Sequence, residues 1–117
     1  MKFKDKVVLV TGGGTGLGRA MCLHFAREGA AVVVNYSKSK ERAQEVVDRI
    51  EAMAGRAAAV QADVSHDSQA RQLIEKAVAR FGRLDILINN AGWTRFIPHS
   101  DLEELSDEVL KQLEEEE

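Results

Sequence analysis

Several features are scarce in this sequence, and each shortage excludes a class of protein. The single cysteine, Cys22, cannot form a disulfide within the chain, which fits a reducing compartment such as the cytoplasm. No apolar run approaches the roughly 20 residues that a membrane-spanning helix requires. Residues 1 to 5 are too short and too polar for a secretory signal. We therefore expect a cytoplasmic protein without a membrane span, in which Cys22 is a small buried residue on a helix.

The charge balance shows no excess of basic residues. The 117 residues include 16 Lys and Arg against 19 Asp and Glu, a net charge of −3, and acidic residues gather at the C-terminus. A surface that binds nucleic acid or an anionic membrane needs the opposite sign, so we expect neither partner. His24, His66 and His99 lie far apart, with no cysteine or carboxylate cluster at metal-ligand spacing. We expect no bound metal.

The sequence does contain a regular alternation of strand and helix patterns. Apolar, β-branched runs predict strands at residues 6–11, 31–36, 57–62 and 84–89. Helical periodicity predicts helices at 17–28, 39–54, 67–81 and about 101–116. Strands without polar alternation, joined by helices, indicate a parallel sheet covered on both faces. We predict one α/β domain over residues 1–117, with three layers and four parallel strands in the order 3-2-1-4.

Glycine is concentrated where the first predicted strand meets the first helix. Residues 8–21 read VLVTGGGTGLGRAM, with five glycines among fourteen residues. A helix N-terminus offers unpaired N–H groups and partial positive charge, which a diphosphate can accept only if the backbone comes close. Gly12 would then turn the chain, Gly16 would admit the diphosphate, and Gly18 would let the helix pack against the sheet. A plain glycine-rich turn is the alternative, although it needs only one or two glycines. A P-loop is excluded because Gly-Lys-Ser/Thr is absent.

A second motif, NNAG at residues 89–92, ends the fourth predicted strand. In the order 3-2-1-4, strands 1 and 4 are neighbours, so Asn90 and Gly12 should meet at the carboxyl edge of the sheet. Ligands of such sheets bind at this edge, where the strand order reverses. Ordinary turn chemistry is the alternative explanation for Asn89 and Asn90.

Together, TGGGTGLG (residues 11–18), ADV (62–64) and NNAG (89–92) resemble the signatures of short-chain dehydrogenases/reductases. The similarity is greatest to 3-oxoacyl-carrier-protein reductases and glucose dehydrogenase-like members, and it extends over residues 1 to about 109. The resemblance implies a Rossmann-type half-domain that binds a dinucleotide cofactor. It implies that the pyrophosphate and adenosine ribose are held by Gly12, Gly14, Thr15, Gly16, Leu17 and Gly18. It also implies that Asp63 and Val64 line the adenine, and that Asn90, Ala91 and Gly92 support strand 4 and approach the nicotinamide-side ribose. For Asp63, a turn or capping role is the alternative.

The end of the second strand bears on the choice of coenzyme. An acidic residue about 20 residues past the glycines binds the ribose 2′-OH and selects NAD. This sequence has Tyr36, Ser37 and Lys38 there instead, followed by basic residues at 40 and 42. Cations at a helix N-terminus are unfavourable unless an anion such as a 2′-phosphate accepts them. Thr15 counts against NADP, because NADP-selective relatives often carry a basic residue at that position. We expect NADP, with NAD tolerated; ordinary solvated cations are the alternative.

The residues that carry out the family's chemistry are not evident. The family reduces carbonyls with a Tyr-x-x-x-Lys pair on a helix, aided by a serine and an asparagine. The one such string here runs from Tyr36 to Lys40, across a strand end and a loop, so we expect it not to be catalytic. Residues 110–117 read LKQLEEEE, an idealised helix pattern of high propensity. We therefore predict no catalytic residue, and a truncated N-terminal half of a reductase closed by an engineered helix end.

Three functions follow from these patterns. The chain is an NADP(H)-binding module without redox chemistry, a carbonyl or 3-oxoacyl reductase whose catalytic half is supplied elsewhere, or a truncated or designed scaffold that binds nothing tightly. We favour the binding module. Strand 4 would form an open edge unless it is covered or paired with a second copy, so we also predict a possible homodimer through that edge or through the last helix. A packing role is expected for Trp93.

Overall fold

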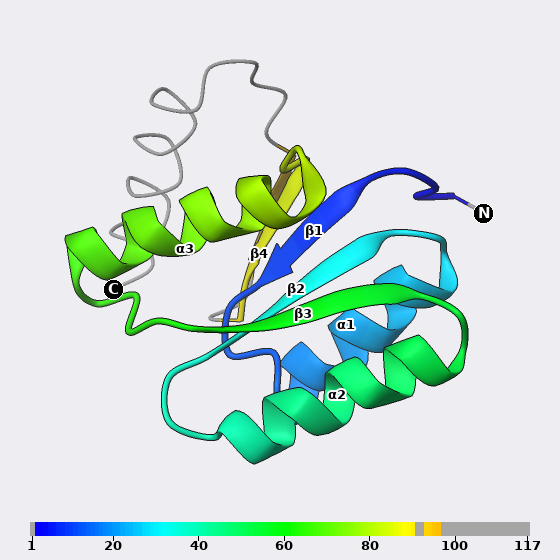
Figure 1. The fold of residues 1–117 in the computed structure, drawn as a ribbon, viewed down its shortest axis with the longest axis horizontal. Helices are drawn as coiled ribbons and strands as arrows, with labels where there is room; N and C mark the ends of the chain where they lie inside the picture. Colours follow the sequence, from blue (N-terminus) through cyan, green and yellow to red (C-terminus); the bar gives the residue numbers. More distant parts are fainter. Residues whose placement is uncertain (1, 91–92, 97–117) are drawn as a thin grey trace.

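The computed structural model describes residues 2–90 and 93–96. Figure 1 shows the elements in chain order. They are β1 (Val7–Val10), α1 (Gly16–Arg27), β2 (Ala31–Tyr36), α2 (Lys40–Ala52), β3 (Arg56–Gln61), α3 (Asp67–Phe81), β4 (Ile86–Asn89) and β5 (Trp93–Phe96). The strands and helices predicted up to residue 89 are all present, with ends within two residues of those predicted. The predicted last helix, including the expected engineered end at 110–117, lies outside the described residues.

The sheet has the order β3-β2-β1-β4-β5. The first four strands are parallel, with Val10 of β1 opposite Val34 of β2 on one side and Ile88 of β4 on the other. The predicted order 3-2-1-4 is therefore confirmed. Because these strands run in the same direction, the segments that follow β1, β2 and β4 all emerge at one carboxyl edge.

The fifth strand was not predicted. β5 pairs antiparallel with β4, from Ile86 opposite Phe96 to Asn89 opposite Trp93. An unpaired β4 would present a row of free N–H and C=O groups, and β5 supplies their partners from within the chain. The β4 edge is therefore covered, by β5 rather than by a second copy. A homodimer through the predicted last helix stays a prediction.

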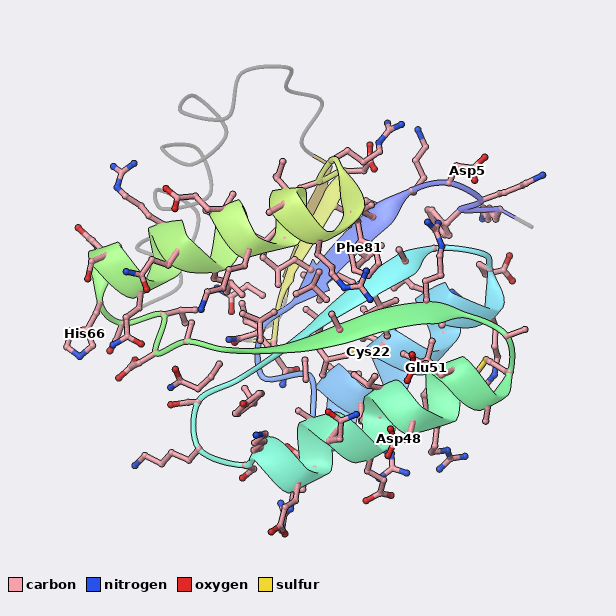
Figure 2. The ribbon with its side chains drawn as sticks, viewed as in Figure 1. Asp5, Cys22, Asp48, Glu51, His66 and Phe81 are labelled. Carbon is pink, nitrogen blue, oxygen red and sulfur yellow. The ribbon has the colours of Figure 1, made fainter. Side chains whose placement is uncertain are left out.

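The core lies on both faces of the sheet because successive residues of each strand point to opposite sides. On one face, Val8 and Val10 pack in a cluster with Cys22 of α1 and Ile50 of α2. On the other face, Leu9 of β1 packs in a cluster with residues of α3. Figure 1 shows α1 and α2 on one side of the sheet and α3 on the other, and Figure 2 places Cys22 and Phe81 on these opposite sides. Each fully buried aliphatic side chain contributes about 2 kcal/mol, so the strands form a firm support for the loops at their ends.

The amino edge of β1 is held by a buried carboxylate. Asp85, which is 5% exposed, accepts the N–H of Val7 at Oδ2 (2.9 Å) and donates its own N–H to the carbonyl of Val7 (3.0 Å). Its Oδ1 accepts hydrogen bonds from Arg83 Nε (3.0 Å) and Nη2 (2.6 Å). These hydrogen bonds raise the pKa of the Arg83 guanidinium. This cluster fixes β1 beside β4 at the edge of the sheet opposite the glycine loop.

Two negative findings apply to the described part of the chain. None of its helices has the length and apolar character needed to cross a membrane. Within residues 2–90 and 93–96, no three His, Cys, Asp or Glu side chains are grouped so that they could hold a metal ion.

Candidate nucleotide-binding site

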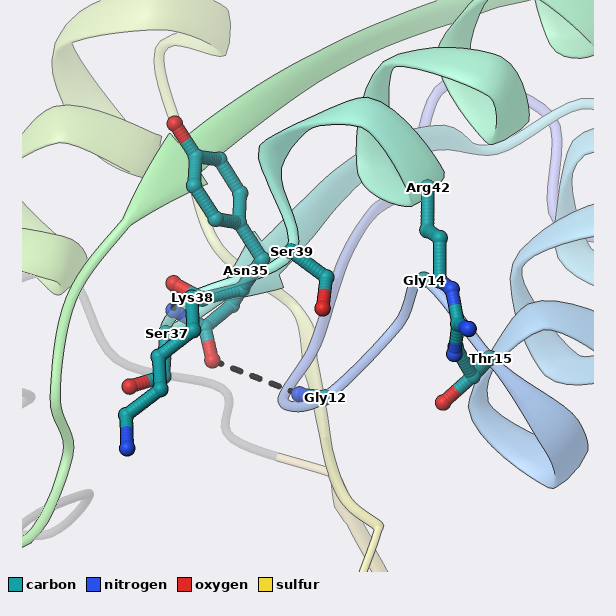
Figure 3. A pocket seen from close by; sticks show the side chains of 9 residues that line it. Gly12, Gly14, Thr15, Asn35, Ser37, Lys38, Ser39 and Arg42 are labelled. Carbon is teal, nitrogen blue, oxygen red and sulfur yellow. Dashed lines mark hydrogen bonds between the residues drawn. The ribbon is translucent and has the colours of Figure 1, made fainter.

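A cavity of about 360 Å³ opens at the carboxyl edge of the sheet, between the loop after β1 and the loop after β2. Figure 3 shows its lining. Six of the lining residues are ones that the sequence singled out: Gly12, Gly14, Thr15, Tyr36, Ser37 and Lys38. The others are Asn35, Ser39 and Arg42. The structure therefore brings the glycine-rich segment and the end of β2 together around one space.

The glycines of the loop differ in what they make possible. Gly12 and Gly16 have φ angles of +58° and +53°, a left-handed conformation that is costly for residues with a Cβ. A Cβ on Gly18 would overlap the carbonyl oxygen of Gly12, so only glycine lets α1 come this close to the turn. A Cβ on Gly16 would meet nothing within 4 Å. The turn at Gly12 and the close packing at Gly18 agree with the predicted roles, and Gly16 faces open space.

The N-terminus of α1 carries backbone N–H donors that no other described residue accepts. The N–H of Arg19 donates to the carbonyl of Thr15 (3.2 Å). Within the described part of the chain, the N–H groups of residues 16, 17 and 18 donate to no acceptor, as expected for the first turn of a helix. The first turn contains no acidic side chain, and Thr15 does not cap it. The partial positive charge of the helix end is therefore not neutralised locally.

The NNAG motif meets the glycine loop as the strand order predicts. Asn90 donates from Nδ2 to the carbonyl of Gly12 (3.1 Å) and from its N–H to Thr11 Oγ1 (3.1 Å). Thr11 is buried, and its hydroxyl donates in turn to Asn89 Oδ1 (3.2 Å). Hydrogen bonds of Thr11 and Asn90 thus connect the end of β1 to the end of β4, next to the glycine loop that lines the cavity. Ala91 and Gly92 lie outside the described residues.

The predicted adenine-side residues do not line the cavity. Asp63 Oδ1 accepts hydrogen bonds from the hydroxyl (2.6 Å) and N–H (3.0 Å) of Ser65, and these bonds are the main reason that the pKa of Asp63 is lowered. Its Oδ2 lies 3.6 Å from Nε2 of His66, and the nearby charges of His66 and Lys38 lower the pKa further. Asp63 is therefore a carboxylate at neutral pH and stabilises a turn, which was the alternative interpretation. Val64 is partly buried against the α3-side cluster.

Other predicted residues occupy different positions. Leu17 is 62% exposed at the start of α1. Like Gly16, Gly18 and Asn90, it lies beside the cavity's glycine loop rather than among the lining residues. Tyr36, the only tyrosine in the chain, ends β2, and Lys40 begins α2. The two therefore do not share a helix, as expected.

Of the three further lining residues, Asn35 and Ser39 were missed by sequence reasoning, and Arg42 was considered only as one of the basic residues that a 2′-phosphate could accept. Asn35 is 3% exposed, and the visible signal was one polar residue within the apolar strand segment AVVVNY. Arg42 lies in the first turn of α2, where a Cβ on Gly14 would come within 3.4 Å of Arg42 Cβ. Figure 3 shows Arg42 extending toward Thr15, with Lys38 on the other side of Gly12. The lining thus holds two cations and no acidic side chain.

Cys22 lies directly beneath the glycine loop. Its Sγ is 3.8 Å from the carbonyl oxygen of Gly13, and burial raises the pKa of the thiol to about 12. Because only the thiolate reacts, we expect iodoacetamide at pH 8 to modify Cys22 at least about 100-fold more slowly than a free cysteine peptide. Mass spectrometry of timed samples measures the rate, and unfolding in guanidinium should restore it. Fast alkylation of the folded chain would show that the loop leaves Cys22 uncovered.

The sheet order and the glycine loop at the start of α1 define a dinucleotide-fold α/β protein. A family model described as short chain dehydrogenase matches residues 6–113, so the chain belongs to the short-chain dehydrogenase family. It is 47% identical to the short-chain dehydrogenase/reductase homolog YusS of Bacillus subtilis, over 93% of this chain and 100% of that protein. It is 50% identical to a probable tetrahydroxynaphthalene reductase of Zymoseptoria tritici, over 94% of this chain and 42% of that protein.

Solved structures of other dehydrogenases are similar to this chain in sequence and in fold. A dehydrogenase/reductase from Sinorhizobium meliloti is 45% identical, with a TM-score of 0.74, over 76% of this chain and 35% of that one. A short-chain dehydrogenase from Burkholderia cenocepacia, solved in complex with NADP, is 37% identical with a TM-score of 0.77. That match covers 97% of this chain and 51% of the other. Apart from YusS, the chain spans about half or less of the length of these relatives.

Proposed function

We propose that this chain is an NADP(H)-binding module, in which the start of α1 holds the diphosphate and the cavity beside β2 holds the adenosine ribose with its 2′-phosphate. The observation that carries the proposal is the cavity lining, which has Lys38 and Arg42 but no acidic residue, next to unused N–H groups at a helix N-terminus. An acid at the end of β2 would repel a 2′-phosphate. The NADP complex of the Burkholderia relative supports this choice of coenzyme.

The chemistry of the lining suits a phosphate dianion. Hydrogen bonds between a cation and a phosphate are worth about 1.5–3 kcal/mol each, and hydroxyl groups of Ser37 and Ser39 border the same space. Asp63 and Val64 would lie toward the adenine, as proposed from the family resemblance. The charge of Lys38, which lines the cavity, contributes to lowering the pKa of Asp63, which supports placing the adenine beside the cavity in this proposal. Asn90, Ala91 and Gly92 would lie on the nicotinamide side.

Titration of the chain with NADPH, NADH and ADP tests the proposal. We expect NADPH to bind at least tenfold more tightly than NADH, which corresponds to about 1.4 kcal/mol. NADPH fluorescence measures binding directly, and calorimetry serves for ADP. Failure of all three ligands to bind would overturn the proposal and favour a scaffold without a ligand. Equal affinity for NADPH and NADH would refute the assignment of the 2′-phosphate to the cavity.

A second candidate is NADP-dependent carbonyl reduction, because the fungal relative is named as a reductase. The only tyrosine of this chain lies at the end of β2, beside the proposed adenosine site, so a general acid at the nicotinamide would have to come from elsewhere. A ketone-dependent loss of NADPH absorbance with the isolated chain would establish this activity. Its absence, with NADPH binding intact, would leave the binding module.

Arg42 provides a residue-level test. We expect Arg42→Ala to weaken NADPH binding about tenfold and NADH binding less than about twofold, because only NADPH carries the 2′-phosphate. Arg49→Ala is the matched control, since Arg49 is exposed on the last turn of the same helix and its loss changes the net charge equally. Both affinities should be unchanged in Arg49→Ala. A similar loss for the two coenzymes in Arg42→Ala would mean that Arg42 does not meet a 2′-phosphate.

A further inference from the structure

Asn35 is a buried polar residue in a strand that is otherwise apolar. Its amide makes contacts in two directions. Oδ1 accepts the N–H of Gly12 (3.3 Å), and Nδ2 faces the carbonyl oxygens of Tyr36 (3.4 Å), Val60 (3.2 Å) and Ala62 (3.2 Å). Only this orientation is compatible with the surroundings, because the reverse would place Oδ1 against three carbonyl oxygens. Figure 3 shows the bond to Gly12.

Asn90 binds the other backbone polar group of Gly12. Its Nδ2 donates to the carbonyl oxygen of Gly12 (3.1 Å). Both backbone polar groups of Gly12 are therefore bound by asparagine side chains, one from β2 and one from the end of β4, the two strands that flank β1. The N–H of Gly13 also donates to the backbone carbonyl of Asn35 (2.9 Å). We call Asn35 and Asn90 the Gly12 clamp.

The clamp has two consequences for a ligand. The N–H groups of Gly12 and Gly13 are already used, so a diphosphate must be bound by donors further along, at the start of α1. Glycine also rotates more freely than any other residue, and a left-handed turn at Gly12 is one of several conformations open to it. Holding that conformation before the ligand arrives removes an ordering cost from binding.

We propose that Asn35 is a positioning residue for coenzyme binding, which holds the Gly12 turn so that the first N–H groups of α1 face the 5′-diphosphate. This inference rests on the proposed function. Asparagine suits the task because it combines one acceptor with an NH₂ donor on a short side chain. Aspartate lacks the donor, and leucine has a similar shape but lacks both.

A purely structural role would look different in binding experiments. If Asn35 only satisfied the carbonyl groups of β3, its loss would reduce stability and leave the folded chain's preference among ligands unchanged. If Asn35 positions the loop, its loss weakens ligands that carry the diphosphate more than ligands that lack it. Adenosine 2′-monophosphate has the adenine, the ribose and the 2′-phosphate without the diphosphate, so it separates the two roles.

The test compares NADP⁺ with adenosine 2′-monophosphate in Asn35→Leu and Asn35→Ser, at a temperature where each variant is folded by circular dichroism. We expect NADP⁺ affinity to fall about tenfold more than that of adenosine 2′-monophosphate; the smaller ligand also loses some affinity, because Asn35 and Gly12 line the cavity that holds it. Asp85→Ala is the matched control, because it also removes a buried acceptor of a backbone N–H but lies at the opposite edge of the sheet. It should leave the ratio of the two affinities unchanged. If Asn35→Leu does not fold, Asn35→Ser is the variant that decides.

Equal losses for both ligands, or no loss for either, would overturn the inference while leaving the proposed function intact. If the unsubstituted chain binds neither ligand, the proposed function fails, and the role in coenzyme binding fails with it. Amide hydrogen exchange then tests the clamp without a ligand. Asn35→Ser should speed exchange at Gly12 and Gly13 at least tenfold more than Asp85→Ala does, and unchanged exchange there would refute the clamp.

Discussion

Gly18→Ala should lower the free energy of unfolding by about 3 kcal/mol. At an unobstructed helix position, glycine to alanine stabilises by about 1 kcal/mol, so here even the sign of the change is informative. The added Cβ would overlap the carbonyl oxygen of Gly12 and lie 3.0 Å from Asn90 Nδ2. A backbone oxygen cannot move aside without displacing the turn, and Asn90 would lose its acceptor. Urea unfolding followed by circular dichroism measures the effect.

Gly16→Ala is the control for this loss of stability. A Cβ at Gly16 has no neighbour within 4 Å, so its cost comes only from the left-handed conformation, about 1 kcal/mol. Gly18→Ala should therefore be clearly less stable than Gly16→Ala. A Gly18→Ala chain as stable as the unsubstituted one would show that α1 does not pack against the Gly12 turn as described.

Gly16→Leu should weaken NADPH binding at least about 100-fold, or roughly 2.7 kcal/mol. The space in front of Gly16 is open in the folded chain, and the proposed diphosphate occupies it beside the unused N–H groups of α1. A leucine side chain would fill that space. The free energy of unfolding of Gly16→Leu should match that of Gly16→Ala, because both substitutions place a Cβ on the same left-handed backbone conformation. Fluorescence titration of both variants separates the bulk of the side chain from the backbone effect.

In Gly16→Ala the single methyl group should reduce NADPH affinity by less than about tenfold. Comparable affinities for Gly16→Leu and Gly16→Ala would mean that the diphosphate does not approach Gly16. Together, the Gly18 and Gly16 variants assign packing to one glycine and ligand approach to the other. Such a division is expected from the structure, because one Cβ position is blocked and the other is free.

Much of the fold could be predicted from contiguous residues. Runs such as AVVVNY give β2 with the same bounds in prediction and structure, because a strand buried on both faces is apolar throughout. The helix over residues 67–81 was predicted equally well from its apolar periodicity. β5 was missed because WTRF is short and has no pattern of its own. It is a strand because β4 offers it an unpaired edge.

Some features of the candidate site could likewise be predicted from the sequence, and others required the structure. The glycine spacing alone predicted the turn at Gly12 and the packing at Gly18, since a missing Cβ is a property of the residue itself. That Asn90 would meet Gly12 followed from the strand order. Two features could not be decided from the sequence, because they depend on how separate segments come together in space. They are the position of Arg42 beside Gly14 and the turn that Asp63 forms with Ser65.

By itself, the sequence determined the order of strands and helices, the glycine loop and the lack of an acidic residue at positions 36–38, where β2 ends. These depend on side-chain type and local periodicity, which neighbouring residues specify. Only the tertiary structure decided which donors remain available to a ligand. The N–H of Gly12 is bound by a side chain 23 residues away and its carbonyl by one 78 residues away. A hydrogen bond depends on distance and angle in space, and packing of β1 between β2 and β4 sets both.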